Sequence, residues 1–186
     1  MNTTRTFICI DFPSEIIKEI TRVQGLIKRK KFTGKLTKPE NLHLTLKFLG
    51  NINEEVLKKV QTQLSKIKFP QLECRLVQTG TFNYKLRPRI AWIKILVLNK
   101  LQKQIDTTID SFPQEKRFMS HLTIARIKYT KTPKELINHI SQIKTKPLKF
   151  QINEFKIKSS ELKSPTPIYK TLETYQSTPP TKPKQK

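Results

Sequence analysis

The segment NLHLTLKFLG, residues 41–50, has the alternation of a β-strand with two different faces. Its even-numbered positions are apolar and predict the face toward a core: Leu42, Leu44, Leu46 and Phe48. Three odd-numbered positions are polar and predict the opposite face: His43, Thr45 and Lys47. A strand of an antiparallel sheet with one side in water has the same pattern, so the segment alone predicts a strand and not a site.

The tetrapeptide HLTL at residues 43–46 returns as HLTI at residues 121–124, which is 78 residues later. Two of the three histidines in the chain therefore begin the same motif. Each copy falls on a predicted strand that follows a predicted helix. A repeat of this kind predicts an internally duplicated fold with two lobes.

Apolar periodicity predicts strands and helices along most of the chain. The predicted strands span residues 5–11, 41–50, 71–77, 90–97, 118–127, 148–158 and 168–175, and the helices follow Pro13, Asn51, Asn99 and Thr132. We therefore expect an α+β fold of two lobes related by a pseudo-twofold axis. Each lobe is an antiparallel sheet flanked by helices, and the motif strands face each other across a central catalytic cleft. This domain should span residues 1–176, and the tail 177–186, which lacks large apolar side chains, should be disordered.

The formal net charge of +23 predicts attraction to polyanions such as RNA, although a generally lysine-rich composition also accounts for it. No segment has the roughly 20 apolar residues that span a bilayer, and the N-terminus lacks the apolar run of a signal peptide. We expect a cytoplasmic monomer with no membrane partner. The two cysteines, Cys9 and Cys74, lie in strand-like segments and do not suggest a disulfide.

The repeated motif has a chemical meaning if its two copies confront each other. Imidazoles on opposite sides of a phosphate, from His43 and His121, can act as general acid and general base. The hydroxyls of Thr45 and Thr123 can donate hydrogen bonds to the nonbridging oxygens. Neither motif carries a carboxylate on its polar face, so we expect no metal and no other cofactor. The residues alone leave open which histidine is the acid.

The paired motifs resemble the His-x-Thr-x motifs of the two-histidine phosphoesterase superfamily. The chain is most similar to the RNA 2′,3′-cyclic phosphodiesterases of the LigT type, once called 2′-5′ RNA ligases. The segments that carry the resemblance are RTFICIDFP, ENLHLTLKFLG, the Gly-Thr-Phe at 80–82 with RPRIAW, SHLTIAR, and Ser160-Glu-Leu with Tyr169. One departure is the segment SPTP before Tyr169, where that family usually has a glycine.

The resemblance implies a metal-independent hydrolase that opens RNA 2′,3′-cyclic phosphate ends to 2′-phosphates, with reversible 2′-5′ ligation as a related activity. It implies His43 as the proton donor and His121 as the proton acceptor. Two alternatives stay open: a non-catalytic RNA-end binding module, and a phosphodiesterase for a small cyclic nucleotide. Hydrolysis of a cyclic phosphate end excludes the first, and the salt dependence of binding separates RNA from small substrates.

Other side chains are weaker candidates for substrate binding: Lys47, Arg126, Tyr84 and Arg89, with Arg87 beside the last. Lys47 is an even number of residues from His43, so strand alternation predicts it on the same face. Arg126 is an odd number of residues from His121, so alternation predicts it on the opposite face. The family that the chain resembles nevertheless has an arginine at the position of Arg126. Tyr84 and Arg89 lie in a predicted loop that can reach RNA. The third histidine, His139, is expected to be structural or exposed, and Trp92 is expected in the core.

Overall fold

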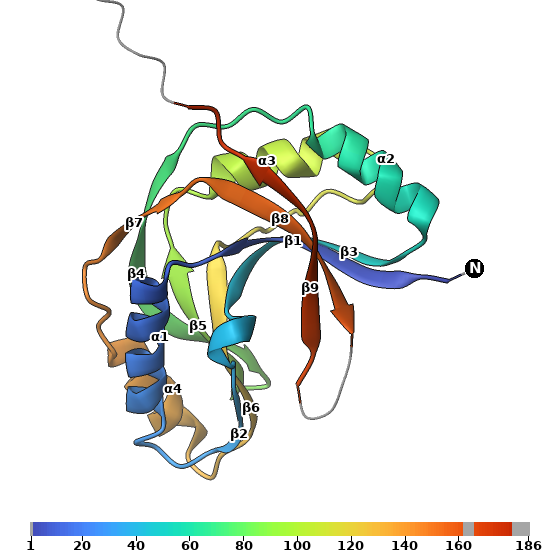
Figure 1. Cartoon of the computed structure of the whole chain (residues 1–186). Coiled ribbons are helices and arrows are strands. Elements are labelled where there is room, and N and C mark those ends of the chain that lie inside the picture. Colours follow the sequence, from blue (N-terminus) through green and yellow to red (C-terminus); the bar gives the residue numbers. More distant parts are fainter. Residues whose placement is uncertain (1, 162–165, 180–186) are drawn as a thin grey trace, which may run out of the picture.

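The predicted strands form two antiparallel sheets in the computed structural model, which describes residues 2–161 and 166–179 (Figure 1). The first sheet has the order β3 (His43–Ile52), β1 (Thr4–Asp11), β8 (Glu154–Glu161) and β9 (Ile168–Gln176). The second has the order β2 (Thr33–Leu36), β6 (His121–Tyr129), β5 (Arg87–Ile95), β4 (Leu72–Tyr84) and β7 (Lys149–Ile152). Each HLT motif therefore begins a strand, and the two motif strands lie in different sheets.

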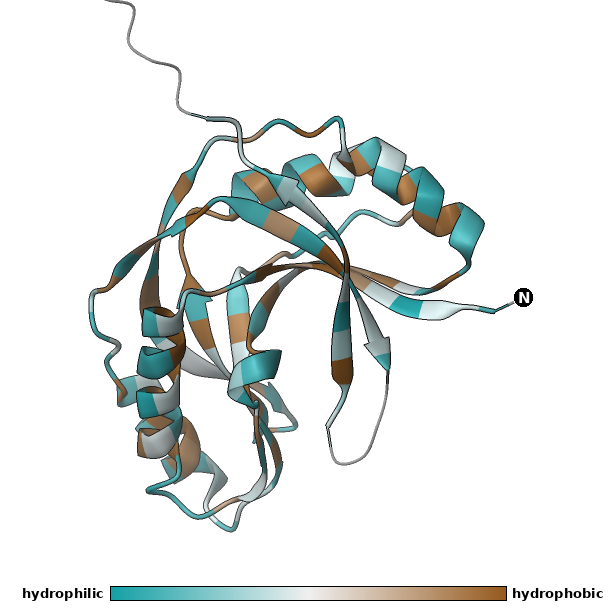
Figure 2. Ribbon diagram, viewed as in Figure 1, coloured by the Kyte–Doolittle hydropathy of each residue, from teal (hydrophilic) through white to brown (hydrophobic). Residues whose placement is uncertain are grey.

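The helices are α1 (Ser14–Ile27), α2 (Glu54–Leu64), α3 (Asn99–Thr108) and α4 (Pro133–Gln142), with a short 3₁₀ helix, η1 (Pro39–Asn41), before β3. Helices α2 and α3 cover the first sheet, and α1 and α4 cover the second (Figure 1). Figure 2 shows hydrophobic residues along the strands and on one side of the helices, which accounts for the core between these layers. None of the described helices has the length and apolarity needed to cross a membrane.

The two lobes exchange their first helices. Helix α1 follows β1 of the first sheet but packs on the second, where the Gln24 amide Nε2 donates to the Ile124 carbonyl of β6 at 2.8 Å. Helix α3 follows β5 of the second sheet but packs against β3 of the first. Each lobe thus depends on a helix from the other half of the chain. The predicted α+β fold with two related lobes is confirmed.

Each motif strand contains a β-bulge at the same place in the repeat. The pairing of β1 with β3 skips Leu46, and the pairing of β5 with β6 skips Ile124. A bulge sets two residues against one and inverts the alternation of side chains beyond it. The burial patterns of HLTLKFL and HLTIARI are accordingly identical, with the sixth residue exposed in each, Phe48 and Arg126.

Backbone hydrogen bonds to the strands and loops of the domain continue two residues past the expected boundary at residue 176. The Ser177 N–H donates to the Asn153 carbonyl at 2.6 Å, and the Thr178 N–H donates to the Phe69 carbonyl at 2.8 Å. Residues 180–186 of the expected tail lie outside the described residues, as does the first half of the segment SPTP, Ser164 and Pro165. The carbonyl of Pro167, which ends that segment, accepts a hydrogen bond from the Asn41 amide at 3.1 Å.

Candidate active site

The strands that begin with the two HLT motifs, β3 and β6, approach each other. The chain that leads into β3 is tied to β6, because the Thr37 N–H donates to the Ile124 carbonyl at 3.0 Å and its hydroxyl donates to the Thr123 carbonyl at 2.9 Å. On each of these strands the histidine and the threonine of the motif are partly exposed on one side of the strand: His43 and Thr45 on β3, and His121 and Thr123 on β6. We call this side of β3 and β6 the site face.

Both imidazoles are fixed by the same backbone contact. Nδ1 of His43 lies 2.8 Å from the Asn41 carbonyl oxygen, and Nδ1 of His121 lies 2.7 Å from the Met119 carbonyl oxygen. A carbonyl can only accept, so Nδ1 carries the proton in each neutral ring. This leaves Nε2 of each ring free to accept a proton, or to donate one when the ring is charged. The two halves therefore present chemically equivalent nitrogen atoms.

Aromatic rings hold the imidazoles in place. The ring of His43 lies 4.9 Å from Phe7 and packs edge-on against Tyr169 at 5.0 Å. The ring of His121 packs edge-on against Phe82 at 4.8 Å. Phe82 belongs to the Gly-Thr-Phe segment, but its contact with the histidine was not predicted from the sequence. Each imidazole thus has one edge-on aromatic neighbour, and this contact restricts the direction in which Nε2 points.

The environment of His43 disfavours its charged form. Burial lowers the pKa of His43 to about 4, and repulsion by Lys158 and Arg126 acts in the same direction. The hydrogen bond to the Asn41 carbonyl and the charge of Asp11 oppose this shift. Asp11 in turn holds Lys158, with 2.6 Å between the carboxylate and Nζ. His43 is thus neutral at pH 7 in the unliganded protein.

The motif threonines can both reach a ligand. Thr45 and Thr123 are two residues beyond the histidines on the same face. Within residues 2–161 and 166–179, neither hydroxyl makes a hydrogen bond. Each can therefore donate its proton to a bound anion.

The bulges overturn two expectations about charged residues. The prediction that Lys47 shares the face of His43 is wrong: Lys47 is 6% exposed and forms an ion pair with Asp106 of α3. The prediction that Arg126 points away from His121 is also wrong. Arg126 is exposed, and its charge acts on both His43 and Tyr169 of the other lobe. Arg126 therefore replaces Lys47 as the candidate cation for the phosphate.

Tyr84 and Arg89 lie far from the motifs. His121 pairs with Lys94 of β5. Arg89 lies five residues from Lys94 along β5, and Arg87, which pairs with Tyr84 of β4, lies seven residues from it. At the usual rise of a strand these separations correspond to about 15–25 Å. Arg89 donates to the Lys128 carbonyl at 3.0 Å. The fold therefore does not bring these residues to the histidines.

The remaining histidine and the tryptophan have structural surroundings. His139 Nε2 lies 2.9 Å from the Leu26 carbonyl oxygen, which links α4 to α1. Trp92 is 8% exposed, and its ring lies over Gly80, where a Cβ atom would approach it to 2.4 Å. The expected structural roles of both residues agree with these contacts.

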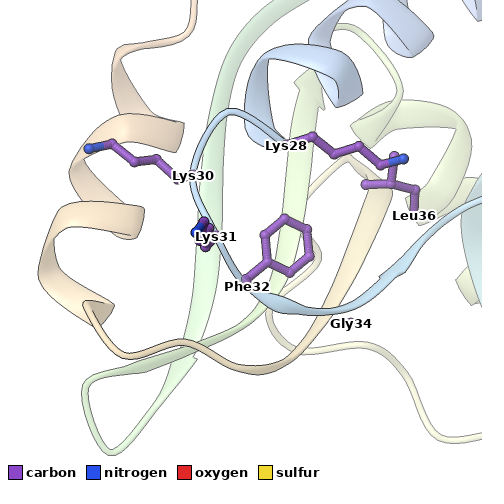
Figure 3. Close-up of a pocket in the computed structure, with 6 residues that line it drawn as sticks. All are labelled: Lys28, Lys30, Lys31, Phe32, Gly34 and Leu36. Carbon is purple, nitrogen blue, oxygen red and sulfur yellow. The ribbon is translucent and has the colours of Figure 1, made fainter.

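Two further features of the described chain lie outside the motifs. A hollow beside the edge strand β2 contains none of the candidate residues (Figure 3). It is lined by Lys28, Lys30, Lys31, Phe32, Gly34 and Leu36. In the part of the chain that the structure describes, no three side chains of His, Cys, Asp or Glu gather in a metal-binding group.

Comparison with known proteins identifies the family of the chain. Residues 10–92 and 96–169 match the model of the LigT-like phosphoesterase family. The chain therefore belongs to the LigT-like phosphoesterases. It is similar to the RNA 2′,3′-cyclic phosphodiesterase of Methanocaldococcus jannaschii, with 32% identity over 92% of this chain and 99% of the relative. The protein of the same description from Thermotoga maritima is 31% identical, over 90% of this chain and 92% of the relative.

Solved structures show the same fold. The crystal structure of E. coli LigT complexed with 3′-AMP superposes with a TM-score of 0.75 and 23% identity, covering 95% of this chain and 99% of that one. The apo form of E. coli LigT gives a TM-score of 0.76 with 21% identity, covering 96% of this chain and all of the other.

Proposed function

We propose that this protein hydrolyses RNA 2′,3′-cyclic phosphate ends to 2′-phosphate ends, with His43 and His121 as the acid and base. The observation that carries the proposal is the pair of HLT motifs, each with its Nδ1 held by a backbone carbonyl and its Nε2 free. Binding alone requires no such matched pair of titratable groups. The names of the curated relatives support the choice of substrate.

In the proposed reaction, Nε2 of neutral His121 takes a proton from water as the water oxygen bonds to phosphorus. The bond between phosphorus and O3′ breaks, and Nε2 of protonated His43 donates its proton to O3′. The product keeps the phosphate on O2′. If the 5′-hydroxyl of another RNA replaces water, the same steps give a 2′-5′ linkage.

The pKa of His43 sets a condition on this assignment. A donor must be protonated, yet burial and two nearby cations keep free His43 neutral. A bound phosphate places negative charge beside Lys158, Arg126 and the ring, and this raises the pKa of His43. Binding of the substrate thus favours the protonated form of His43, which is the proposed proton donor. Without that rise, His43 is better suited to the role of base.

The nonbridging oxygens need donors of hydrogen bonds as negative charge develops on them. The hydroxyls of Thr45 and Thr123 and the guanidinium of Arg126 fill this role in the proposal. Together these groups supply an acid, a base and charge stabilisation, so the reaction is proposed to be independent of metal ions.

The test uses a short RNA with a 2′,3′-cyclic phosphate, incubated with protein in EDTA, followed by mapping of the product end. We expect a 2′-phosphate product. His43→Ala and His121→Ala should each lower the rate by about 10²–10⁴, whereas His139→Ala serves as the matched control and keeps the rate. Near-normal hydrolysis in both motif variants would refute the roles of the two histidines, whereas RNA binding without any hydrolysis by the wild type would favour the RNA-end binding module.

A further inference from the structure

An aromatic ring stands open to solvent beside the candidate catalytic groups. Phe48 is 69% exposed, although most large apolar side chains of its strand are buried. It pairs with Phe7 across β1 and β3, and directly paired residues share a face of the sheet. Phe7 also contacts His43, so Phe48 lies on the site face. The exposed phenyl ring at this position is open to contact with a ligand bound on the site face.

One side of the Phe48 ring lies against a buried aromatic residue. Its centroid lies 6.4 Å from that of Phe7, which is 3% exposed and also packs edge-on against Tyr169 at 5.2 Å. The support fixes one side of Phe48 and leaves the other to a ligand. Flat apolar surface next to a phosphate site is what a nucleobase requires.

The duplication makes the position of Phe48 informative. Phe48 and Arg126 are each the sixth residue of their motif, follow equivalent bulges, and are both exposed. The first motif therefore has an aromatic ring, Phe48, at the position where the second motif has a positive charge, Arg126. A nucleotide has the same polarity, with a planar base on one side of the ribose and an anionic phosphate on the other.

We propose that Phe48 is a stacking platform for the base of the nucleotide that carries the cyclic phosphate, and that it fixes the orientation of the substrate between the two lobes. This inference rests on the proposed function. Phe48 lies three residues beyond Thr45, about 10 Å along the strand and less across a bulge. A phosphate held by Thr45 and Arg126 leaves the base of its own nucleotide within reach of Phe48. The orientation in turn decides that His43, and not its counterpart, faces O3′.

The test compares two substrates that share the reacting group. One is adenosine 2′,3′-cyclic phosphate, and the other is methyl riboside 2,3-cyclic phosphate, which has no base. The full-length protein should prefer the nucleotide in kcat/KM. Phe48→Ala should reduce that preference by about 5- to 150-fold, the range for loss of one base–aromatic stack. Phe48→Trp should keep it, because the larger ring also stacks.

Tyr129→Ala is the matched control, since it removes an aromatic ring that is 51% exposed on the other motif strand. It should leave the preference unchanged, and thermal unfolding should show that all variants fold. The inference is overturned if Phe48→Ala keeps the preference of the wild type or if the wild type has none. It is equally overturned if Phe48→Ala changes only the sedimentation behaviour, which would assign the ring to a contact between protein molecules.

A binding measurement separates this inference from the proposed function. Calorimetry with adenosine 2′-phosphate and methyl riboside 2-phosphate needs no turnover. The same 5- to 150-fold loss of preference in Phe48→Ala supports the base platform even if no variant hydrolyses a cyclic phosphate. Equal affinities for the two compounds in the wild type overturn it, whatever the hydrolysis assay shows.

Discussion

The imidazole of His43 should titrate near pH 4 in the free protein and closer to neutrality when an anion occupies the site. Burial lowers its pKa from 6.5 to about 4, with repulsion by Lys158 and Arg126 as a further cause. At 1.36 kcal/mol per pKa unit, the neutral ring is favoured by about 3 kcal/mol. The partial exposure of the ring makes this an upper value.

A phosphate group reverses part of this shift. An opposite charge within about 4–6 Å changes a pKa by about 1–3 units, so the pKa of His43 should rise to about 5–7 with a nucleoside 2′-phosphate bound. Arg126→Met should also raise the pKa in the free protein, because it removes one of the repelling cations. The two changes act by the same electrostatic route and should not be fully additive.

The shift also makes stability depend on pH. The folded pKa of His43 lies below the unfolded value, so the unfolded chain binds the additional proton between pH 6.5 and pH 4. The contribution of neutral His43 is complete above pH 6.5 and is lost as the pH falls toward 4. Between pH 7 and pH 4.5, the wild type should therefore lose about 1–3 kcal/mol more stability than His43→Gln. Urea unfolding at both pH values measures this difference.

Nuclear magnetic resonance of the histidine rings provides the direct assay, with His→Gln variants to assign the three signals. The pH profile of kcat/KM reports the free protein and that of kcat reports the complex, so the limb due to His43 should lie at higher pH in kcat. A pKa of His43 above 6 in the free protein would refute the argument from burial. A pKa that does not respond to phosphate would refute its role as the donor.

Three further predictions concern the site and its support. Thr45→Val and Thr123→Val should each lower kcat by about 10²–10³ at unchanged melting temperature, and wild-type kinetics would exclude contact with phosphate. Turnover should be unchanged after dialysis against EDTA, and recovery of a lost rate by a divalent ion alone would refute the metal-free reaction. Lys47→Met should cost about 3–5 kcal/mol in urea unfolding because the Asp106 carboxylate is left buried and unpaired. Adding Asp106→Leu should restore much of that loss and keep activity, which a Lys47 that bound substrate would not allow.

The duplicated motif was sufficient to predict the fold class and to select His43 and His121, because an internal repeat is a global signal that local errors do not erase. Strand parity failed for the next residues, since a bulge lies at the fourth position of each motif. The sequence does contain a signal of this bulge. The buried apolar positions change from even to odd, from Leu46 to Leu49 in the first strand and from Ile124 to Ile127 in the second. A change of phase within a strand indicates a bulge.

The exchange of helices between lobes could not be predicted from periodicity. The apolar stripe of a helix shows which side is buried but not which sheet it covers. Helix α1 follows β1 of the first sheet directly in sequence, yet it packs on β6 of the second sheet, to which the next strand, β2, also belongs. The partner of Lys47 was hidden for the same reason, because Asp106 is distant in sequence and meets it only once α3 crosses to the first sheet.

A duplicated scaffold creates a difficulty for an enzyme whose substrate is not symmetric. The repeated HLT motifs place two equivalent Nε2 atoms, and equivalent groups cannot by themselves divide the roles of acid and base. The division must come from positions where the halves differ. Lys158 and Asp11 lie beside His43, and the exposed sixth residue is Phe48 in one motif and Arg126 in the other. In the proposed reaction the repeat thus supplies the reacting groups, and we expect these few differences to decide the direction in which a nucleotide is bound and cleaved.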